Sequence, residues 1–125
     1  MINVLVVDDE EDVQFLFKQY FRREIRKAQI SFTFALSGEA ALEHLRHTDT
    51  DVVLVLSDIN MPGMTGLELL KIIKSQFPAL RVVMITAYGD AQNRQTAFSY
   101  GADGYVTKPI DFTALKKTIA KMAEA

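Results

Sequence analysis

Five polar side chains follow short apolar runs of this sequence, at positions where they could act together. They are Asp8 and Asp9 after residues 2–7, Asp58 after the run that starts at residue 52, Thr86 at the end of 81–86 and Lys108 at the end of 105–108. Uniformly apolar runs of this length are typical of parallel strands that are buried on both faces. Because the carboxyl ends of such strands meet at one edge of a sheet, we expect these five side chains to converge there.

Three carboxylates that lie close together need either raised pKa values or a cation at neutral pH. A hard divalent ion such as Mg²⁺ would satisfy them, since it binds carboxylates, carbonyls and water. Lys108 would complement an anionic group brought by a ligand, and Thr86 would donate a hydrogen bond to it. Mg²⁺, a lysine and a hydroxyl donor are what phosphoryl transfer needs, and a carboxylate such as that of Asp58 can act as the nucleophile.

The segments that must position these residues alternate between strand and helix along the chain. The apolar and polar patterns predict five strands, at residues 2–7, 31–36, 52–58, 81–86 and 105–108. The second of these alternates in polarity, which indicates a half-buried strand at the edge of the sheet. Five helices are predicted between and after the strands, over residues 13–25, from 38, from 67 to 77, over 90–100 and from 111, where Asp111 can serve as an N-cap. Strict alternation of this kind predicts an α/β fold with helices on both faces of a parallel sheet.

The bulk composition excludes several classes of protein. The chain has 125 residues, which predicts one domain over 1–125, with 49% hydrophobic and 24% charged residues. A net charge of -2 argues against nucleic-acid binding by this segment, and the lack of cysteine excludes disulfides and thiolate metal sites. No apolar run approaches the length of a membrane span, and the sequence starts with a strand pattern, without a signal peptide. We therefore expect a cytoplasmic protein with no membrane contact.

Four stretches resemble the receiver domain of the response regulators in bacterial two-component signalling. They are VVDDE at 6–10, LSDINMPGMTGLELL at 56–70, ITA at 85–87 and YVTKP at 105–109. The resemblance covers nearly the whole chain and keeps the order of the motifs. It implies a flavodoxin-like doubly wound sheet with strand order 2-1-3-4-5, and a cis peptide bond between Lys108 and Pro109.

The resemblance also implies a role for each residue at the predicted edge. Asp58 would accept the phosphoryl group, while the metal would be held by Asp8, Asp9, Asp58 and the backbone carbonyl of Asn60. Thr86 would be the switch hydroxyl, Tyr105 the switch aromatic and Lys108 the lysine that contacts the phosphoryl group. Asn60 and Tyr88, each two residues beyond a site residue, would flank the path of the water that hydrolyses the acyl phosphate.

A receiver domain would be a phosphoprotein that signals and would not be an enzyme with turnover. Its partners would be a histidine kinase or phosphotransfer protein, and an output domain or downstream protein that reads the face formed by the last two helices and the fifth strand. The resemblance also makes a homodimer that forms on phosphorylation possible.

Two other functions remain open from the residues alone. The first is a Mg²⁺-dependent phosphatase with an aspartate nucleophile, although such enzymes carry a D-x-D pattern where this chain has Asp8-Asp9-Glu10. The second is an interaction domain that keeps the fold without the phosphoryl chemistry, which the presence of Asp9, Asp58 and Lys108 argues against.

Overall fold

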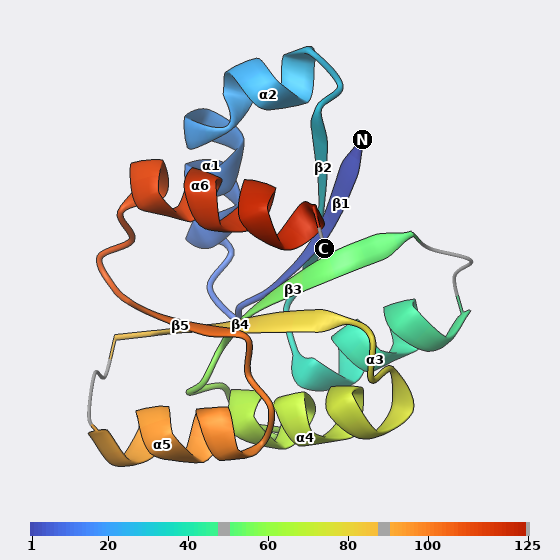
Figure 1. The fold of residues 1–125 in the computed structure, drawn as a ribbon, viewed down its shortest axis with the longest axis vertical. Coiled ribbons are helices and arrows are strands. Elements are labelled where there is room, and N and C mark those ends of the chain that lie inside the picture. The colour runs from blue at the N-terminus through green and yellow to red at the C-terminus, as the bar shows by residue number, and fades with distance from the viewer. Residues whose placement is uncertain (48–50, 88–90, 125) are drawn as a thin grey trace.

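The computed structural model describes residues 1–47, 51–87 and 91–124, which form alternating strands and helices (Figure 1). The strands are β1 (Ile2–Val7), β2 (Ile30–Ala35), β3 (Val52–Asp58), β4 (Arg81–Thr86) and β5 (Gly104–Thr107). The helices are α1 (Asp12–Tyr20), α2 (Arg22–Arg26), α3 (Gly38–His47), α4 (Gly66–Gln76), α5 (Ala91–Ser99) and α6 (Phe112–Ala123). None of the helices in the described ranges is both long and apolar enough to cross a membrane.

All five strands are parallel and lie in the order β2-β1-β3-β4-β5, which confirms the predicted topology. The register brings the ends of the strands level with one another. Val7 pairs with Ser57, Asp58 with Ile85, and Thr86 with Thr107. The residues that follow β1 therefore lie beside the end of β3, as the apolar runs predicted.

The sheet separates two hydrophobic cores, because successive side chains of a strand point to opposite faces. On one face, α3, α4 and α5 cover a core that includes Val7, Leu70 and Met84. On the other face, α1 and α6 cover a core that includes Phe17 and Leu115. Both layers hold the central strands in place, so the ends of β1 and β3 are fixed from two sides.

Six helices replace the five that the pattern predicted, because the expected first helix divides at Phe21. The backbone angles there are φ -105° and ψ 15°, outside the helical range, while Phe21 itself is buried and stacks on Phe17. The hydrogen bonds continue through the break, from Phe21 N to the carbonyl of Phe17 and from Ile25 N to that of Phe21. The two segments therefore change direction without losing contact.

Three apolar residues of this helical region have the three- and four-residue spacing of a core-facing stripe but do not face the core. Leu16, Tyr20 and Ile25 are all more than a third exposed, whereas Val13, Phe17 and Phe21 are buried. The apolar stripe of the sequence is thus wider than the surface that the sheet can cover. At the sheet edge, Leu36 is also exposed and lies just beyond β2, which ends at Ala35.

The two helices that follow the site loops begin at caps. Thr65 caps α4 with a capping box, in which its hydroxyl accepts from Glu68 N and the Glu68 carboxylate accepts from Thr65 N. Asp111 caps α6 by accepting from Ala114 N at 3.1 Å, as predicted. These caps fix where each helix starts relative to the strand before it.

Candidate functional site

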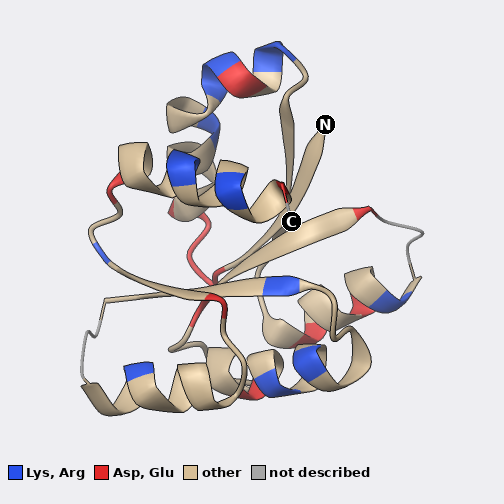
Figure 2. Cartoon of the chain, viewed as in Figure 1, with Lys and Arg blue, Asp and Glu red and all other residues tan. Residues whose placement is uncertain are grey.

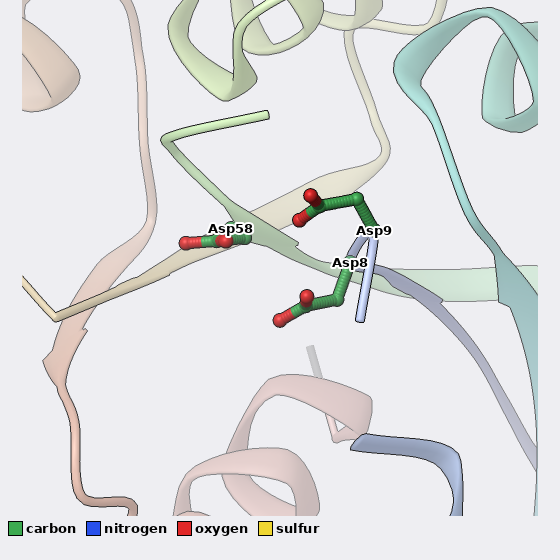
Figure 3. A group of neighbouring side chains, drawn as sticks. All are labelled: Asp8, Asp9 and Asp58. Carbon is green, nitrogen blue, oxygen red and sulfur yellow. The ribbon is translucent and has the colours of Figure 1, made fainter. Parts of the chain in front are cut away.

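Asp8, Asp9 and Asp58 come together at the carboxyl ends of β1 and β3 (Figure 3). One carboxylate oxygen from each of the three lies within 4.8 Å of the others. Asp58 is only 8% exposed and Asp8 only 7%, while Asp9 is exposed. The predicted convergence of the three carboxylates is therefore present, with one open side.

Backbone donors fix two of these side chains. Ile59 N donates to Asp58 Oδ1 at 2.9 Å, and Glu10 N donates to Asp8 Oδ1 at 2.9 Å. In each case the second oxygen, Oδ2, faces Lys108. The Lys108 ammonium donates to Asp8 Oδ2 at 3.1 Å and lies 3.9 Å from Asp58 Oδ2. One oxygen of Asp58 is thus held, and the other is turned toward a cation.

The electrostatics of the cluster follow from burial and from the shortage of positive charge. Burial raises the pKa of Asp58 above its usual value, Lys108 lowers it by less, and the neighbouring Asp8 and Asp9 raise it further. Burial alone would lower the pKa of Lys108, but the charge and hydrogen bond of Asp8, with Asp58 and Glu10, raise it. One ammonium is too little for three carboxylates, so the site favours a further cation.

The donor set fits Mg²⁺, because it consists of carboxylate oxygens with an open side for water. Within the described ranges, these three aspartates form the one group of at least three acidic, histidine or cysteine side chains close enough to share an ion. Asn60, whose carbonyl was expected as a further ligand, is exposed in the loop directly after β3. Tyr88, predicted to flank the water path, lies outside the described residues.

Thr86 and Tyr105 lie on the same face of the sheet. Thr86 is fully buried at the end of β4 and pairs with Thr107, while Tyr105 pairs with Met84. Paired residues of adjacent strands share a face, as do alternate residues of one strand, so the two side chains are diagonal neighbours. The backbone also joins these strands to the site, since Lys108 N donates to the carbonyl of Thr86 at 2.7 Å. The Lys108–Pro109 peptide bond is cis, as expected.

The ring of Tyr105 is partly buried and packs against α5. Its centroid lies 6.5 Å from that of Phe98, and the Arg94 guanidinium lies 5.8 Å from the Tyr105 centroid and 5.5 Å from that of Phe98. The sequence pattern did not identify Arg94, because its contact with Tyr105 joins two different elements.

Gly66 is a further site residue that the sequence analysis missed. A Cβ atom at Gly66 would lie 1.9 Å from the carbonyl oxygen of Asp58, and Gly66 N donates to the carbonyl of Ile59 at 2.8 Å. The first residue of α4 therefore packs directly against the backbone that carries the Asp58 carboxylate. A glycine at the start of a helix, where its flexibility is unfavourable, is the signal that could have revealed this.

Sequence comparisons agree with this geometry. A family model described as response regulator receiver domain matches residues 4–120. A DNA-binding transcriptional regulator NtrC from Proteus hauseri is 37% identical over 123 residues, which cover 98% of this chain and 24% of that protein. A heme response regulator HssR from Staphylococcus haemolyticus (strain JCSC1435) is 35% identical over 115 residues, which cover 92% of this chain and 48% of that protein. The chain thus spans less than half the length of these relatives.

Solved structures share the fold over almost the whole chain. The signal receiver domain of an HD domain-containing protein from Pseudomonas fluorescens Pf-5 has a TM-score of 0.88 and 26% identity, and the alignment covers 98% of this chain and 94% of that one. Response regulator protein TrrA from Thermotoga maritima, solved in complex with Mg²⁺-BeF, has a TM-score of 0.80 and 31% identity. That alignment covers 98% of this chain and 99% of the other.

Proposed function

The chain belongs to the family of response regulator receiver domains, and on that premise we propose that Asp58 is its phosphoacceptor. Receiver domains are signalling modules of two-component systems, so neither a phosphatase nor a domain without the chemistry is favoured. The observation that carries the proposal is the position of the Asp58 carboxylate. It is buried at the end of β3, with carboxylates of Asp8 and Asp9 on one side and the Lys108 ammonium 3.9 Å away.

Asp58 Oδ2 is the oxygen suited to attack, because Oδ1 accepts a hydrogen bond from Ile59 N. In the transfer, a bond forms from Oδ2 to phosphorus and the bond from phosphorus to the donor's leaving group breaks. The leaving group, such as an imidazole or acetate, carries away the electron pair. Lys108 neutralises charge on the phosphoryl oxygens, and Thr86 donates a hydrogen bond to one of them.

Asp8, Asp9, Asp58 and the carbonyl of Asn60 would hold Mg²⁺. When bound, the ion supplies positive charge beside the transferring group and orients it. Hydrolysis of the acyl phosphate returns the carboxylate and releases inorganic phosphate. The domain thus promotes only its own phosphorylation and dephosphorylation, and we propose that residues 1–125 form this one module.

Intact-mass spectrometry with acetyl phosphate tests the acceptor. The wild-type chain should gain one phosphoryl mass with Mg²⁺ present and none with a chelator. Asp58→Asn should gain none, and Asp12→Asn, which alters an exposed carboxylate on α1, should react as the wild type does. Equal labelling of the wild type and Asp58→Asn would contradict the assignment.

We propose that the histidine phosphodonor docks on an apolar surface beside the site. Phe15 is 71% exposed and Leu16 42% exposed, on the turn of α1 next to the site loop. A groove adjoins them, lined by Glu10, Val13, Leu16, Tyr20, Lys108, Pro109, Ile110 and Phe112. The groove therefore reaches from exposed apolar residues to the lysine of the site.

Two donors distinguish docking from chemistry. Phe15→Ala/Leu16→Ala should slow transfer from a cognate phosphohistidine protein but leave the rate with acetyl phosphate unchanged, since a small donor needs no surface. An equal loss with both donors would show that the substitutions disturb the site itself. Val53→Ala, at a partly exposed apolar residue on β3, serves as the control for a general loss of apolar surface.

The signal would leave through Tyr105 to a downstream protein, an output domain or a second copy of the chain. A groove at the edge of β5 and α6 offers a surface, lined by Arg81, Val83, Asp103, Gly104, Tyr105, Val106, Thr118, Lys121 and Met122. Turning the Tyr105 ring changes this face, so a partner that fits one ring position would sense phosphorylation.

A further inference from the structure

A third groove lies at the β2 edge of the sheet, away from the proposed phosphoryl chemistry. It runs between β2 and the helices α1 and α2, and its volume is about 510 Å³. Its lining combines apolar and basic side chains with one serine, namely Met1, Lys18, Arg22, Ile25, Arg26, Ile30, Ser31, Phe32 and Phe34. Among the residues that the structure describes, none in this lining is acidic, although the chain as a whole has a net charge of -2.

The backbone of β2 offers free hydrogen-bonding groups along this groove. Ile2 N donates to the carbonyl of Gln29 and Asp8 N to that of Ala35, so the odd-numbered residues of this segment face β1. In a parallel ladder the alternate residues then direct their N–H and C=O groups outward. These residues are Ile30, Phe32 and Phe34, and β1 is the only strand that pairs with β2 in the described sheet.

Edge strands usually carry a charge, a proline or a bulge that prevents pairing with another chain. The sequence of β2, ISFTFA, has neither a charge nor a proline, and its register with β1 is regular over six residue pairs. The other edge strand, β5, is shorter, with four residues. The outer edge of β2 is therefore the part of the sheet most able to accept a further strand.

Three cations lie beside this edge without acidic partners. Among residues 1–47, 51–87 and 91–124, no carboxylate lies within 4.0 Å of the charged groups of Lys18, Arg22 or Arg26. Lys18 does contact the face of Phe34, with Nζ 5.7 Å from the ring centroid. Figure 2 shows the basic residues of α2 at the end of the molecule that is remote from α4 and α5.

We propose that the outer edge of β2 binds an extended acidic peptide segment of a partner protein. The segment would add a strand through the backbone groups of Phe32 and Phe34. The alternate side chains of this strand that face α1 and α2 would be carboxylates, and they would pair with Lys18, Arg22 and Arg26. Backbone pairing supplies affinity in this mode, and the cations select an acidic sequence.

Charge complementarity decides against a second copy of the chain as the occupant. Pairing of β2 with β2 from another copy would bring two sets of Lys18, Arg22 and Arg26 to one interface, with no acidic residue in either groove lining. Like charges across an interface are destabilising. An acidic segment removes that repulsion and uses the same backbone groups.

The probe for this site is a short fluorescein-labelled peptide of alternating glutamate and valine, added to the intact chain. Fluorescence anisotropy gives its affinity, and NMR hydrogen exchange reports the amides of Phe32 and Phe34, which should exchange more slowly in the complex. Two comparison peptides separate the contributions. One replaces each glutamate by lysine, and the other carries N-methyl groups at alternate backbone nitrogens, which blocks pairing with an edge strand.

The variant Arg22→Glu/Arg26→Glu should weaken binding of the acidic peptide by about tenfold or more. Its matched control is Lys71→Glu/Lys117→Glu, which reverses two exposed charges on α4 and α6 and should bind as the wild type does. If the variant fails to fold, the N-methylated peptide still tests the proposal on the wild-type chain.

Several outcomes would overturn the proposal. They are equal binding of the lysine peptide, equal binding of the N-methylated peptide, protection of amides away from β2, and self-association through β2 seen by light scattering. The labelling of Asp58 with acetyl phosphate is a separate readout, so failure of this proposal and failure of the phosphoacceptor assignment are distinguishable.

Discussion

Keeping Asp58 ionised has a cost in this fold, because burial and the charges of Asp8 and Asp9 both disfavour the carboxylate. Lys108 offsets only part of that cost, since its 3.1 Å contact is with Asp8 and it lies 3.9 Å from Asp58. The cluster is therefore short of positive charge, which the proposed Mg²⁺ ion would supply.

Asp9→Ala should separate stability from metal binding. Removing one carboxylate relieves repulsion, so without metal the free energy of unfolding should rise by up to about 1 kcal/mol. The stabilisation gained on adding Mg²⁺ should shrink, and phosphorylation by acetyl phosphate should fall. Thermal melting with and without Mg²⁺ measures both effects, with Asp12→Ala as the control. If Mg²⁺ raises the melting temperature of the variant as much as it raises that of the wild type, Asp9 is not a ligand.

Gly66→Ala should disturb the site without touching a reactive group. The new Cβ would clash with the Asp58 carbonyl oxygen, so the backbone there must move, which typically costs about 1–3 kcal/mol. Urea unfolding should show that loss, and acetyl phosphate should label the variant more slowly. Gly63→Ala is the control, because its φ of +72° also penalises a side chain but it has no contact with Asp58. Normal labelling of Gly66→Ala would contradict this role.

The strand-end residues were predicted from the sequence, whereas Gly66 and Arg94 were missed. Asp8, Asp58 and Lys108 follow apolar runs, and the parallel topology alone brings such positions to one edge. A glycine at the start of α4 is the one local signal for Gly66, but the approach of Gly66 to the Asp58 carbonyl and the contact of Arg94 with Tyr105 each join two elements, and no local pattern encodes those distances.

At the scale of elements, α1 shows where periodicity overpredicts burial. Leu16 and Tyr20 have the spacing of core residues, yet the sheet covers only the side that carries Val13 and Phe17. Tyr20 stacks on Phe112 of α6 instead, with the ring centroids 4.2 Å apart. Which apolar residues stay exposed depends on the area that the neighbouring elements can cover, and the pattern of one helix does not contain that information.

Arg94 is positioned to hold the Tyr105 ring against α5. Cation–π contacts of partly exposed groups contribute about 0.5–1 kcal/mol. Arg94→Ala should therefore increase severalfold the population of molecules in which the Tyr105 ring is turned away from α5. NMR of the labelled tyrosine ring should show a changed average position in the unphosphorylated protein. Arg46→Ala, which removes an arginine of α3 that bonds Gln76, is the control. An unchanged Tyr105 signal would remove Arg94 from the switch.

The contact between α2 and α6 should make stability depend on pH. Burial opposes the charge of Glu24, but the hydrogen bond from Lys116, with Nζ 3.1 Å from Oε2, lowers the pKa of Glu24 overall. A lowered pKa means that the contribution is present above the ordinary value near 4.5 and is lost as the pH falls through the folded-state value. Glu24→Gln should therefore cost about 0.5 kcal/mol at neutral pH. That difference should vanish in acid, whereas a constant difference from neutral to acid pH would show that the charge is not responsible.

At the scale of the whole molecule, adjacent strands link the site to the outer surface. Thr86 ends β4 inside the sheet, and Tyr105 lies diagonally across from it on β5. A phosphoryl oxygen that draws the Thr86 hydroxyl toward the site would leave space for the ring behind it.

Thr86→Ala should accept a phosphoryl group but lose most of the response of the downstream partner. In the wild type, phosphorylation should strengthen association with the partner or a second copy by about 1–3 kcal/mol. Titrations with and without a phosphoryl mimic measure this coupling for both proteins. Thr86→Ser keeps the hydroxyl and should restore the response. A full response in Thr86→Ala would refute the path through Thr86.

The sheet divides the interior into two cores, and this division affects how such a sequence can evolve. In the part of the chain that the structure describes, the core under α3, α4 and α5 shares no side chain with the core under α1 and α6. Substitutions such as Leu70→Ala and Phe17→Ala should therefore change stability almost additively. Substitutions that accumulate in one core then need no compensating substitutions in the other. A lineage could remodel the surface around Tyr105 for a new recipient of the signal while the packing around α1 stays as it was inherited.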